Sequence, residues 1–102
     1  MTTYTIKVEK GNTLKIGFGQ PAQNDQIVKD AAECLDDLIR RGQIAGGEVI
    51  RVNGPATMPV AMVLAHGVGH LYQAVTCYDP KLSKYVVVIA HGDKYKIGDL
   101  LD

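Results

Sequence analysis

Hydrophobic and polar residues alternate in two stretches near the start of the chain. Every second residue is hydrophobic over residues 4–8 and again over residues 14–18, on either side of a glycine-containing turn at residues 10–12. A period of two is typical of a strand with one buried face, and two such runs joined by a short turn indicate a hairpin. We therefore predict a hairpin over residues 3–19.

The next segment has the period of a helix. Hydrophobic residues recur at spacings of three and four between Ile27 and Ile39, and Gly42 follows as a stop signal. We expect Asn24 or Asp25 to cap this helix, because short polar side chains accept the first free N–H groups. The acid-before-base order near its end predicts solvent-exposed ion pairs among Asp36, Asp37, Arg40 and Arg41.

The rest of the chain alternates between short strands and a second helix. We predict strands over residues 48–53, 72–78 and 84–90, a helix over residues 58–68 and a turn over residues 79–83. The near-continuous hydrophobic run of residues 84–90 is typical of a strand buried on both faces. Strands that alternate with helices imply parallel neighbours with right-handed crossovers. We therefore predict one α/β domain over residues 1–102, a mixed sheet with a Rossmann-like βαβαβ core and terminal hairpins.

Composition and charge argue against several classes of partner and cellular location. The 102 residues carry 11 basic and 11 acidic groups, and this balance argues against a grip on long nucleic acid, so we expect no DNA partner. No hydrophobic run is long enough to span a membrane and the first residues lack a secretion signal, so we expect a cytoplasmic protein with no membrane contact. Cys34 and Cys77 are predicted to be buried thiols rather than a disulfide.

The candidate catalytic residues lie at the ends of predicted elements. His66 and His70 are four residues apart, but two glycines separate them and no Glu follows His66, so the zinc-protease pattern is absent. Packing or helix capping is the simpler interpretation of His66, whereas His70 fits a structural or a functional role. Asp79 precedes Pro80 and is first of all a turn former, while His91 ends the following strand.

The predicted hairpin separates these candidates. If residues 72–78 pair with residues 84–90, Asp79 lies at one end of the hairpin and both His70 and His91 lie at the other, about 20 Å away at about 3.3 Å per residue. A site that uses all three therefore needs a second subunit. Loops at Gly11-Asn12 and Gly54-Pro55 could offer N–H groups to a phosphate, although neither matches a phosphate-binding motif and each is also a plain turn.

An ordered set of residues in the second half of the chain resembles a known family. The set consists of Gly54-Pro55, Leu64-Ala65-His66, His70, the stretch from Ala74 to Leu82, His91 and Lys96-Ile97-Gly98-Asp99. Through these residues the chain is similar to the small stand-alone CRISPR-associated ring nucleases of type III systems, which are related to the Rossmann-like sensor domains of CRISPR nucleases.

The resemblance implies a metal-dependent phosphodiesterase. Such an enzyme cleaves cyclic tetra-adenylate to linear products and so switches off antiviral signalling, with manganese as the expected metal. It also implies a homodimer, two of which sandwich the cyclic RNA as a ligand-bridged dimer of dimers. Carried over by position, the catalytic residues are His70 and Asp79, the ligand-binding residues are Asn12, Gly54, Lys81 and His91, and the metal ligands are Asp79 and His91.

One position departs from the family pattern and leaves alternatives open. Lys81 stands where an arginine is expected, which keeps the charge but loses bidentate phosphate geometry. A manganese-dependent exoribonuclease acting on short adenylate 3′ ends has the same chemistry with a different substrate. A third hypothesis is a non-catalytic sensor of cyclic oligoadenylate. A fourth is a structural module whose histidines pack in the core or cap helices.

Overall fold

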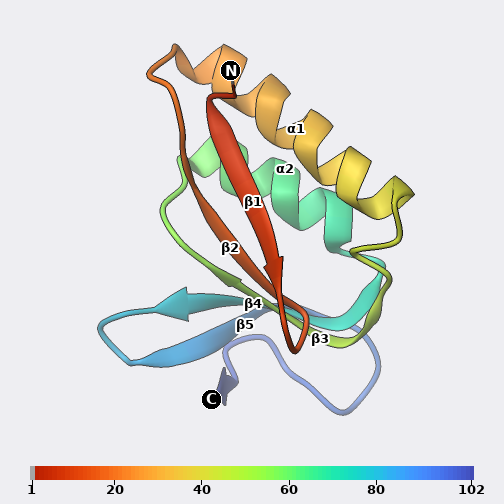
Figure 1. The fold of residues 1–102 in the computed structure, drawn as a ribbon. Helices are drawn as coiled ribbons and strands as arrows, with labels where there is room; N and C mark the ends of the chain where they lie inside the picture. The colour runs from red at the N-terminus through yellow and green to blue at the C-terminus, as the bar shows by residue number, and fades with distance from the viewer. Residues whose placement is uncertain (1) are drawn as a thin grey trace.

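Strands and helices follow one another in the predicted order along residues 2–102, the part of the chain that the computed structural model describes (Figure 1). Only the short last strand, β6, was not predicted. The elements are β1 Tyr4–Glu9, β2 Thr13–Phe18, α1 Asn24–Arg40, β3 Gly47–Asn53, α2 Met58–Val68, β4 Tyr72–Asp79, β5 Lys84–Ala90 and β6 Leu100–Leu101.

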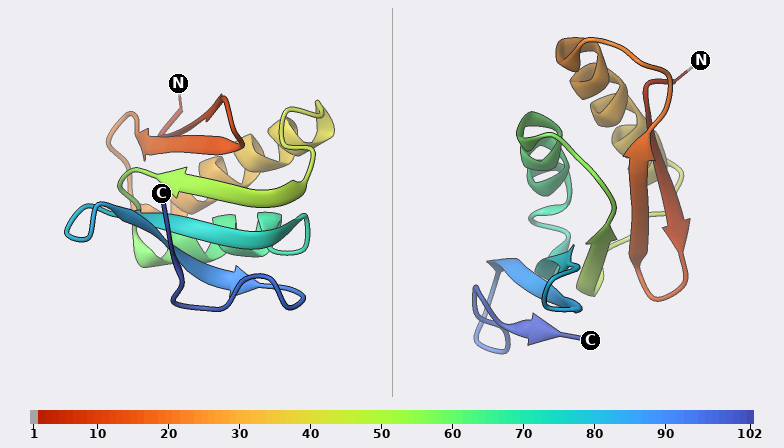
Figure 2. Two further views of the ribbon diagram at one scale, coloured as in Figure 1. Left: turned by 90° about the horizontal axis from the view of Figure 1, so that it is seen from below. Right: turned by 90° about the vertical axis from the view of Figure 1, so that its left-hand side faces the viewer.

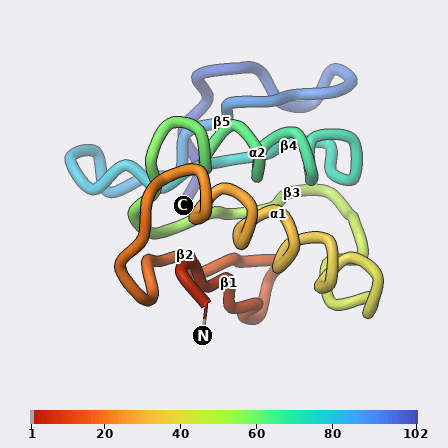
Figure 3. The backbone as a smooth tube through the Cα atoms, turned by 90° about the horizontal axis from the view of Figure 1, so that it is seen from above, coloured from red at the N-terminus to blue at the C-terminus, as the bar shows by residue number. Residues whose placement is uncertain are grey.

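The strands form one mixed sheet in the order β1-β2-β3-β4-β5-β6. β2, β3 and β4 are parallel, and β1, β5 and β6 join by antiparallel pairing. Both crossovers step in the same direction across the sheet, so right-handed connections place α1 and α2 on the same face. Figures 2 and 3 show both helices on that one side. The predicted α/β class is confirmed, and residues 2–102 place no helix on the other face of the sheet.

The core lies between the helices and the covered face of the sheet. The alternation predicted for the first hairpin is confirmed, since Ile6 pairs with Ile16 and both are buried. α1 turns one stripe of its surface inward. The buried core residues of the two hairpin strands, α1 and β3 are Tyr4, Ile6, Leu14, Ile16, Ile27, Ala31, Leu35, Ile50 and Val52.

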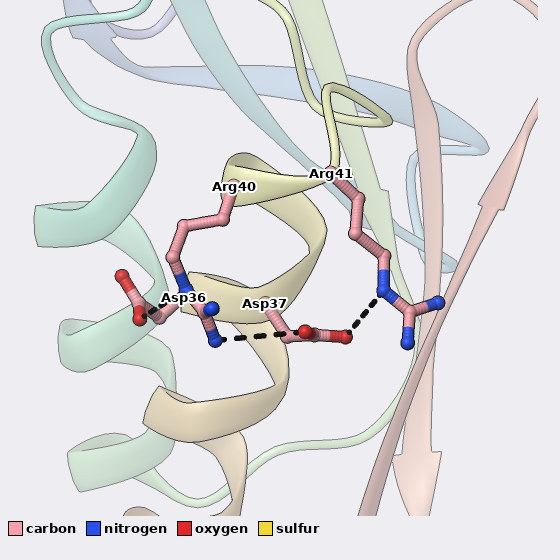
Figure 4. Close-up of polar contacts among 4 residues, drawn as sticks. All are labelled: Asp36, Asp37, Arg40 and Arg41. Atoms are coloured by element: carbon pink, nitrogen blue, oxygen red, sulfur yellow. Dashed lines mark hydrogen bonds and ion pairs between the residues drawn. The ribbon is translucent and has the colours of Figure 1, made fainter.

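The ends of α1 agree with the prediction in position but not in the residue that caps its start. Asn24 and Asp25 lie inside the helix, and the N-cap is Gln23, whose side chain makes no capping bond. The prediction of an Asn24 or Asp25 cap is therefore wrong. The surface ion pairs are confirmed (Figure 4). Arg40 Nε lies 3.2 Å from Asp36 Oδ2, and Arg41 Nε lies 3.0 Å from Asp37 Oδ2.

α2 starts where it was predicted to start and is tied to α1. The Thr57 side chain accepts a hydrogen bond from the Val60 N–H, which caps the helix. The Thr57 hydroxyl also donates to Asn24 Oδ1 at 2.9 Å. The two helices therefore begin side by side, above the carboxyl ends of the parallel strands. Within residues 2–102, neither helix is both long and apolar enough to cross a membrane.

β5 is less buried than its hydrophobic sequence predicts. No helix covers it, and within the strand only Val87 is fully buried while Val88 is 39% exposed. The prediction of burial on both faces is wrong, because the second helix reaches no further than β4. Val88 is also an extra residue: Val75 pairs with Ile89 and Thr76 pairs with Val87, so Val88 forms a bulge.

The two cysteines are free thiols, as predicted, but only one is shielded. Cys34 on α1 is partly buried, whereas Cys77 on β4 is exposed, so the prediction of a buried Cys77 is wrong. Cys77 points to the helix side of the sheet next to the uncovered part of β5. Partial desolvation there raises the pKa of the Cys77 thiol.

The last residues return across the sheet face that carries no helix (Figure 2). β6 pairs with β5, and the main-chain oxygen of Asp102 accepts a hydrogen bond from Arg51 Nε of β3 at 2.9 Å. The Asp102 carboxylate pairs with Lys84, which lowers the pKa of that carboxyl. The last residues do not extend over β1 and β2, so that part of the same sheet face is not covered by them.

We expect the stability of the fold to decrease in alkali through Tyr4. Tyr4 is fully buried and its hydroxyl donates to the Pro55 carbonyl at 2.6 Å. Burial raises its pKa to about 12. The unfolded chain releases this proton near pH ~10, so the free energy of unfolding falls as pH rises from about 10 to about 12.

The Tyr4→Phe variant isolates this effect. It should lose about 1 kcal/mol at pH 7, because the Pro55 carbonyl loses its donor. Its free energy of unfolding should then depend less on pH than that of the wild type between pH ~10 and ~12. Urea unfolding of both proteins at several pH values measures this, and parallel pH profiles would contradict the assignment.

Candidate functional site

His70 and His91 lie side by side at the amino ends of the parallel strands. Their rings stack with centroids 5.3 Å apart and an interplanar angle of 27°. The β5 bulge explains how they meet. The extra residue, Val88, reverses the side of the sheet on which later β5 residues lie, so His91 lies on the side of the helices and its backbone N–H bonds to Gln73.

His91 is held in a fixed orientation by the end of α2. Its Nε2 lies 2.6 Å from the carbonyl oxygen of Gly69. A carbonyl only accepts, so Nε2 carries the proton and Nδ1 has the lone pair when the ring is neutral. Gly69 is buried, and a Cβ there would meet the Ala65 carbonyl oxygen at 2.8 Å. The segment that presents His70 is thus clamped between α2 and β5.

Asn12 lies at the same end of the sheet. It occupies the β1 to β2 turn with φ 55°, and its carbonyl accepts a hydrogen bond from the Arg51 N–H at 2.9 Å. Its side-chain amide approaches Gly47 at the start of β3, beside the ring of Tyr72. We refer to Asn12, His70 and His91 as the amino-end cluster.

Asp79 and Lys81 occupy the opposite end of the β4 to β5 hairpin. Asp79 Oδ1 accepts N–H groups from Lys81 at 2.8 Å and from Leu82 at 3.2 Å, so the carboxylate stabilises the turn. This confirms the turn that was predicted for residues 79–83. The bonds also fix the orientation of the carboxylate, and within residues 2–102 no hydrogen bond is formed by its Oδ2. Lys81 is exposed to solvent.

Gly54 lies at this second end and has a structural reason to be glycine. Its φ is 137°, and a Cβ at this position would lie 1.9 Å from the Ile16 carbonyl oxygen. The loop that follows is anchored by the bond from Tyr4 to Pro55. We refer to Gly54, Asp79 and Lys81 as the carboxyl-end cluster, since β3 and β4 end there.

The six residues predicted for the site therefore separate into two groups of three. β4 runs from one group to the other, and its eight residues span about 23 Å at about 3.3 Å per residue. The register confirms the predicted separation, with Asp79 opposite Lys84 and Ala90 opposite Ala74. No single ligand group of ordinary size touches both clusters of one chain.

A manganese ion does not fit between Asp79 and His91 of one chain. They lie in different clusters, and each already uses one donor atom, Asp79 Oδ1 on the turn and His91 Nε2 on Gly69. No three His, Cys, Asp or Glu side chains within residues 2–102 converge on one point. The chain alone does not provide the several ligands that a hard divalent cation prefers.

A polar group that the sequence did not single out borders the amino-end cluster. Glu48 at the start of β3 accepts hydrogen bonds from Lys94 Nζ at 2.7 Å and from the Tyr95 hydroxyl. These bonds lower the pKa of the Glu48 carboxyl, with Lys94 the larger cause, and they raise the pKa of Tyr95. Residues 48 and 94 are far apart in sequence, so only the fold reveals the group.

Within residues 2–102 the His66 side chain forms no hydrogen bond or ring contact with either cluster, and it lies exposed in the last turn of α2. A basic side chain at this place suits the negative end of the helix dipole. The interpretation of His66 as a capping or packing residue stays a prediction.

Comparison with known proteins adds a family relationship. Residues 23–102 match the family model described as CRISPR-associated protein (Cas_csx3). No curated protein and no solved structure matches the chain. The matched range includes both helices, His70, Asp79, Lys81 and His91, and it leaves out the hairpin that carries Asn12.

The Gly54→Ala substitution should strongly destabilise the fold. The added methyl group would collide with β2 backbone in a conformation that already disfavours side chains, so we expect a loss of about 3 kcal/mol or more. Gly92→Ala is the matched control, since φ is 77° there but nothing lies within 4 Å, and it should cost about 1 kcal/mol. Urea unfolding measures both, and equal losses would refute the close approach.

Proposed function

The chain belongs to the family of CRISPR-associated proteins described as Cas_csx3, and on this basis we propose that it is a phosphodiesterase that opens cyclic tetra-adenylate and so ends type III CRISPR signalling in the cytoplasm. The observation that carries the proposal is the division of the candidate residues into two clusters at opposite ends of β4. The imidazoles are at one end, and the carboxylate and the lysine are at the other.

A complete site then forms between copies of the chain. The amino-end cluster of one copy faces the carboxyl-end cluster of another, with the cyclic RNA between them. Each copy exposes both ends of the sheet, so a dimer has the groups to meet a second dimer on either side of the ligand. A ring of four phosphates needs few donors, and a chain with net charge zero can supply them locally.

The chemistry follows from the groups that meet. The 2′-oxygen of one adenosine attacks the adjacent phosphorus while the bond from phosphorus to the 5′-oxygen breaks, which leaves a 2′,3′-cyclic phosphate and a free 5′-hydroxyl. His70 takes part in the proton transfer from the 2′-hydroxyl to the departing oxygen. Lys81 offers a positive charge to the phosphate, and Asp79 of another copy orients the imidazole.

Manganese enters this proposal only as an ion shared between copies or with the substrate. Its carboxylate and imidazole ligands would come from Asp79 of one copy and His91 of another, because one chain separates them. Activity measured in EDTA and then with added manganese tests whether the ion is needed.

The surface of α2 supports association of the copies. Residues 52–78 contain no Lys, Arg, Asp or Glu, and the helix exposes Met58 at 77% and Met62 at 66%. A cavity of about 180 Å³ opens beside it, between α2 and the uncovered part of β4 and β5. An apolar helix with no charged face is normally buried. Two such surfaces can meet without repulsion, so we propose that α2 joins the homodimer.

Mixing two inactive variants tests the shared site. His70→Ala and Asp79→Ala should each reduce cleavage of cyclic tetra-adenylate by about 10² to 10⁴-fold. When the two variants are mixed and allowed to exchange, activity should return to about one quarter of the wild-type level, since random pairing restores that share of sites. Product analysis by chromatography measures the linear adenylates.

The other outcomes separate the alternative functions. Faster turnover of linear than of cyclic adenylate would identify an exoribonuclease. Tight binding of cyclic tetra-adenylate without turnover, unchanged in both variants, would identify a sensor. Failure of the mixture to recover, although each variant folds, would refute the site between copies. Lys29→Ala on the exposed side of α1 is the control for nonspecific loss.

The Met62→Glu substitution tests the role of α2 in the homodimer. A buried carboxylate between two apolar helices is costly, so the variant should shift from a dimer toward the 11.0 kDa monomer. Met62 is exposed in the single chain, so the circular dichroism spectrum should not change. Light scattering after size exclusion measures the mass, with Lys29→Glu as the control. An unchanged dimer would place the contact elsewhere.

A further inference from the structure

A row of polar and aromatic residues crosses the sheet face that carries no helix. Lys7 of β1 pairs with Lys15 of β2, and Lys15 pairs with Asn53 of β3. Val52 of β3 pairs with Cys77 of β4, so the next residues of these parallel strands, Asn53 and Tyr78, also lie beside each other. Tyr78 in turn pairs with Tyr85 of β5. We call Lys7, Lys15, Asn53, Tyr78 and Tyr85 the sheet row.

The sheet row faces away from both helices. Side chains alternate between the two faces of a strand, and the neighbours of the row on either side, such as Ile6, Leu14 and Val52, are buried against the helices. Lys7 and Lys15 are exposed, and Asn53, Tyr78 and Tyr85 are partly exposed. Five neighbouring strands at about 4.8 Å spacing give the row a length of about 19 Å.

The paired lysines point to an anionic ligand. Like charges directly opposite each other destabilise a strand pair, and within residues 2–102 no carboxylate lies within 4.0 Å of either ammonium group. A lysine on an edge strand protects against aggregation, which accounts for Lys7 on β1. It does not account for Lys15, since β2 lies inside the sheet between β1 and β3.

The tyrosines point to bases as the other part of the ligand. Tyr78 and Tyr85 meet edge to face with centroids 5.2 Å apart, and the Arg51 guanidinium lies 5.8 Å from the Tyr85 ring. The Asp102 carboxylate, whose main-chain oxygen bonds to Arg51, is already paired with Lys84. The C-terminal residues cross this part of the face, but both tyrosine side chains stay partly exposed. Exposed aromatic rings on a sheet stack with nucleic-acid bases, and nearby lysines attract the phosphates between those bases.

We propose that the sheet row is a binding site for a short single strand of nucleic acid. Bases stack at Tyr78 and Tyr85, Asn53 hydrogen-bonds to a base edge, and Lys7 and Lys15 hold backbone phosphates. The row lies on the open face of the sheet and the two clusters lie at the strand ends, so this site is separate from the one proposed for cyclic tetra-adenylate. The balanced net charge opposes a grip on long duplexes, and a row of five residues suits only a few nucleotides.

Fluorescence anisotropy with labelled eight-nucleotide oligoadenylate, in ribose and deoxyribose forms, tests the proposal. The Lys7→Gln, Lys15→Gln double variant should bind at least about tenfold more weakly. The slope of the logarithm of its association constant against the logarithm of the salt concentration should be less negative by about 1.4. Each of the two lost phosphate contacts on a single strand accounts for about 0.7 of this change. Lys29→Gln on α1 is the matched control and should bind like the wild type.

The tyrosine and competition experiments complete the test. Tyr78→Ala should weaken binding about tenfold, and Tyr78→Phe should retain it, because stacking needs the ring and not the hydroxyl. Excess cyclic tetra-adenylate should not displace the oligonucleotide, and the double lysine variant should cleave the cyclic substrate at the wild-type rate. Preference for ribose or for neither sugar supports the site equally.

Two results would overturn the proposal. Wild-type protein that binds neither oligonucleotide at low salt has no such site. A double lysine variant that binds as tightly as the wild type, with the same salt dependence, would show that binding occurs elsewhere. Both results leave the cleavage of cyclic tetra-adenylate unaffected, and inactivity toward that substrate leaves this site unaffected.

Discussion

The direction of the two crossovers decides most of this structure. Because β2, β3 and β4 follow one another across the sheet without a reversal, the right-handed rule places α1 and α2 together on one face. The sheet therefore has no central crevice between helices of opposite faces, which is where Rossmann-like domains form a ligand site. Chemistry is left to the two ends of the strands and to the open face, and the candidate residues are found in those places.

The antiparallel return of β5 along β4 is the second constraint. Through it, His70 and His91 meet while Asp79 is carried about the length of a strand away. A single copy thus presents half of the proposed machinery at each end. A site made of halves from different copies depends on protein concentration and on ligand, because the ligand is what brings the halves together.

Much of the fold follows from local pattern, and the errors have specific physical causes. Periodicity located the hairpin, both helices and β5 because one face of each is repeatedly apolar. Periodicity could not show that no helix packs on β5, since a hydrophobic run has the same sequence pattern whether or not a helix covers it. For the same reason Cys77, which lies next to β5, was wrongly predicted to be buried. The opposite ends of Asp79 and His91 were predictable from hairpin geometry. The stacking of His70 on His91 was not, because it depends on a bulge that leaves no mark in the sequence.

That bulge makes the position of His91 depend on the length of β5. If Val88 were deleted, the pleat would place residues after Val87 on the opposite face, and the imidazole would leave Gly69 for the open side of the sheet. In a chain of this fold that gains or loses one residue here, the equivalent histidine therefore moves from the helix end to the sheet face that carries no helix. Aligning such chains by residue type alone would equate two histidines that occupy different surfaces of the molecule.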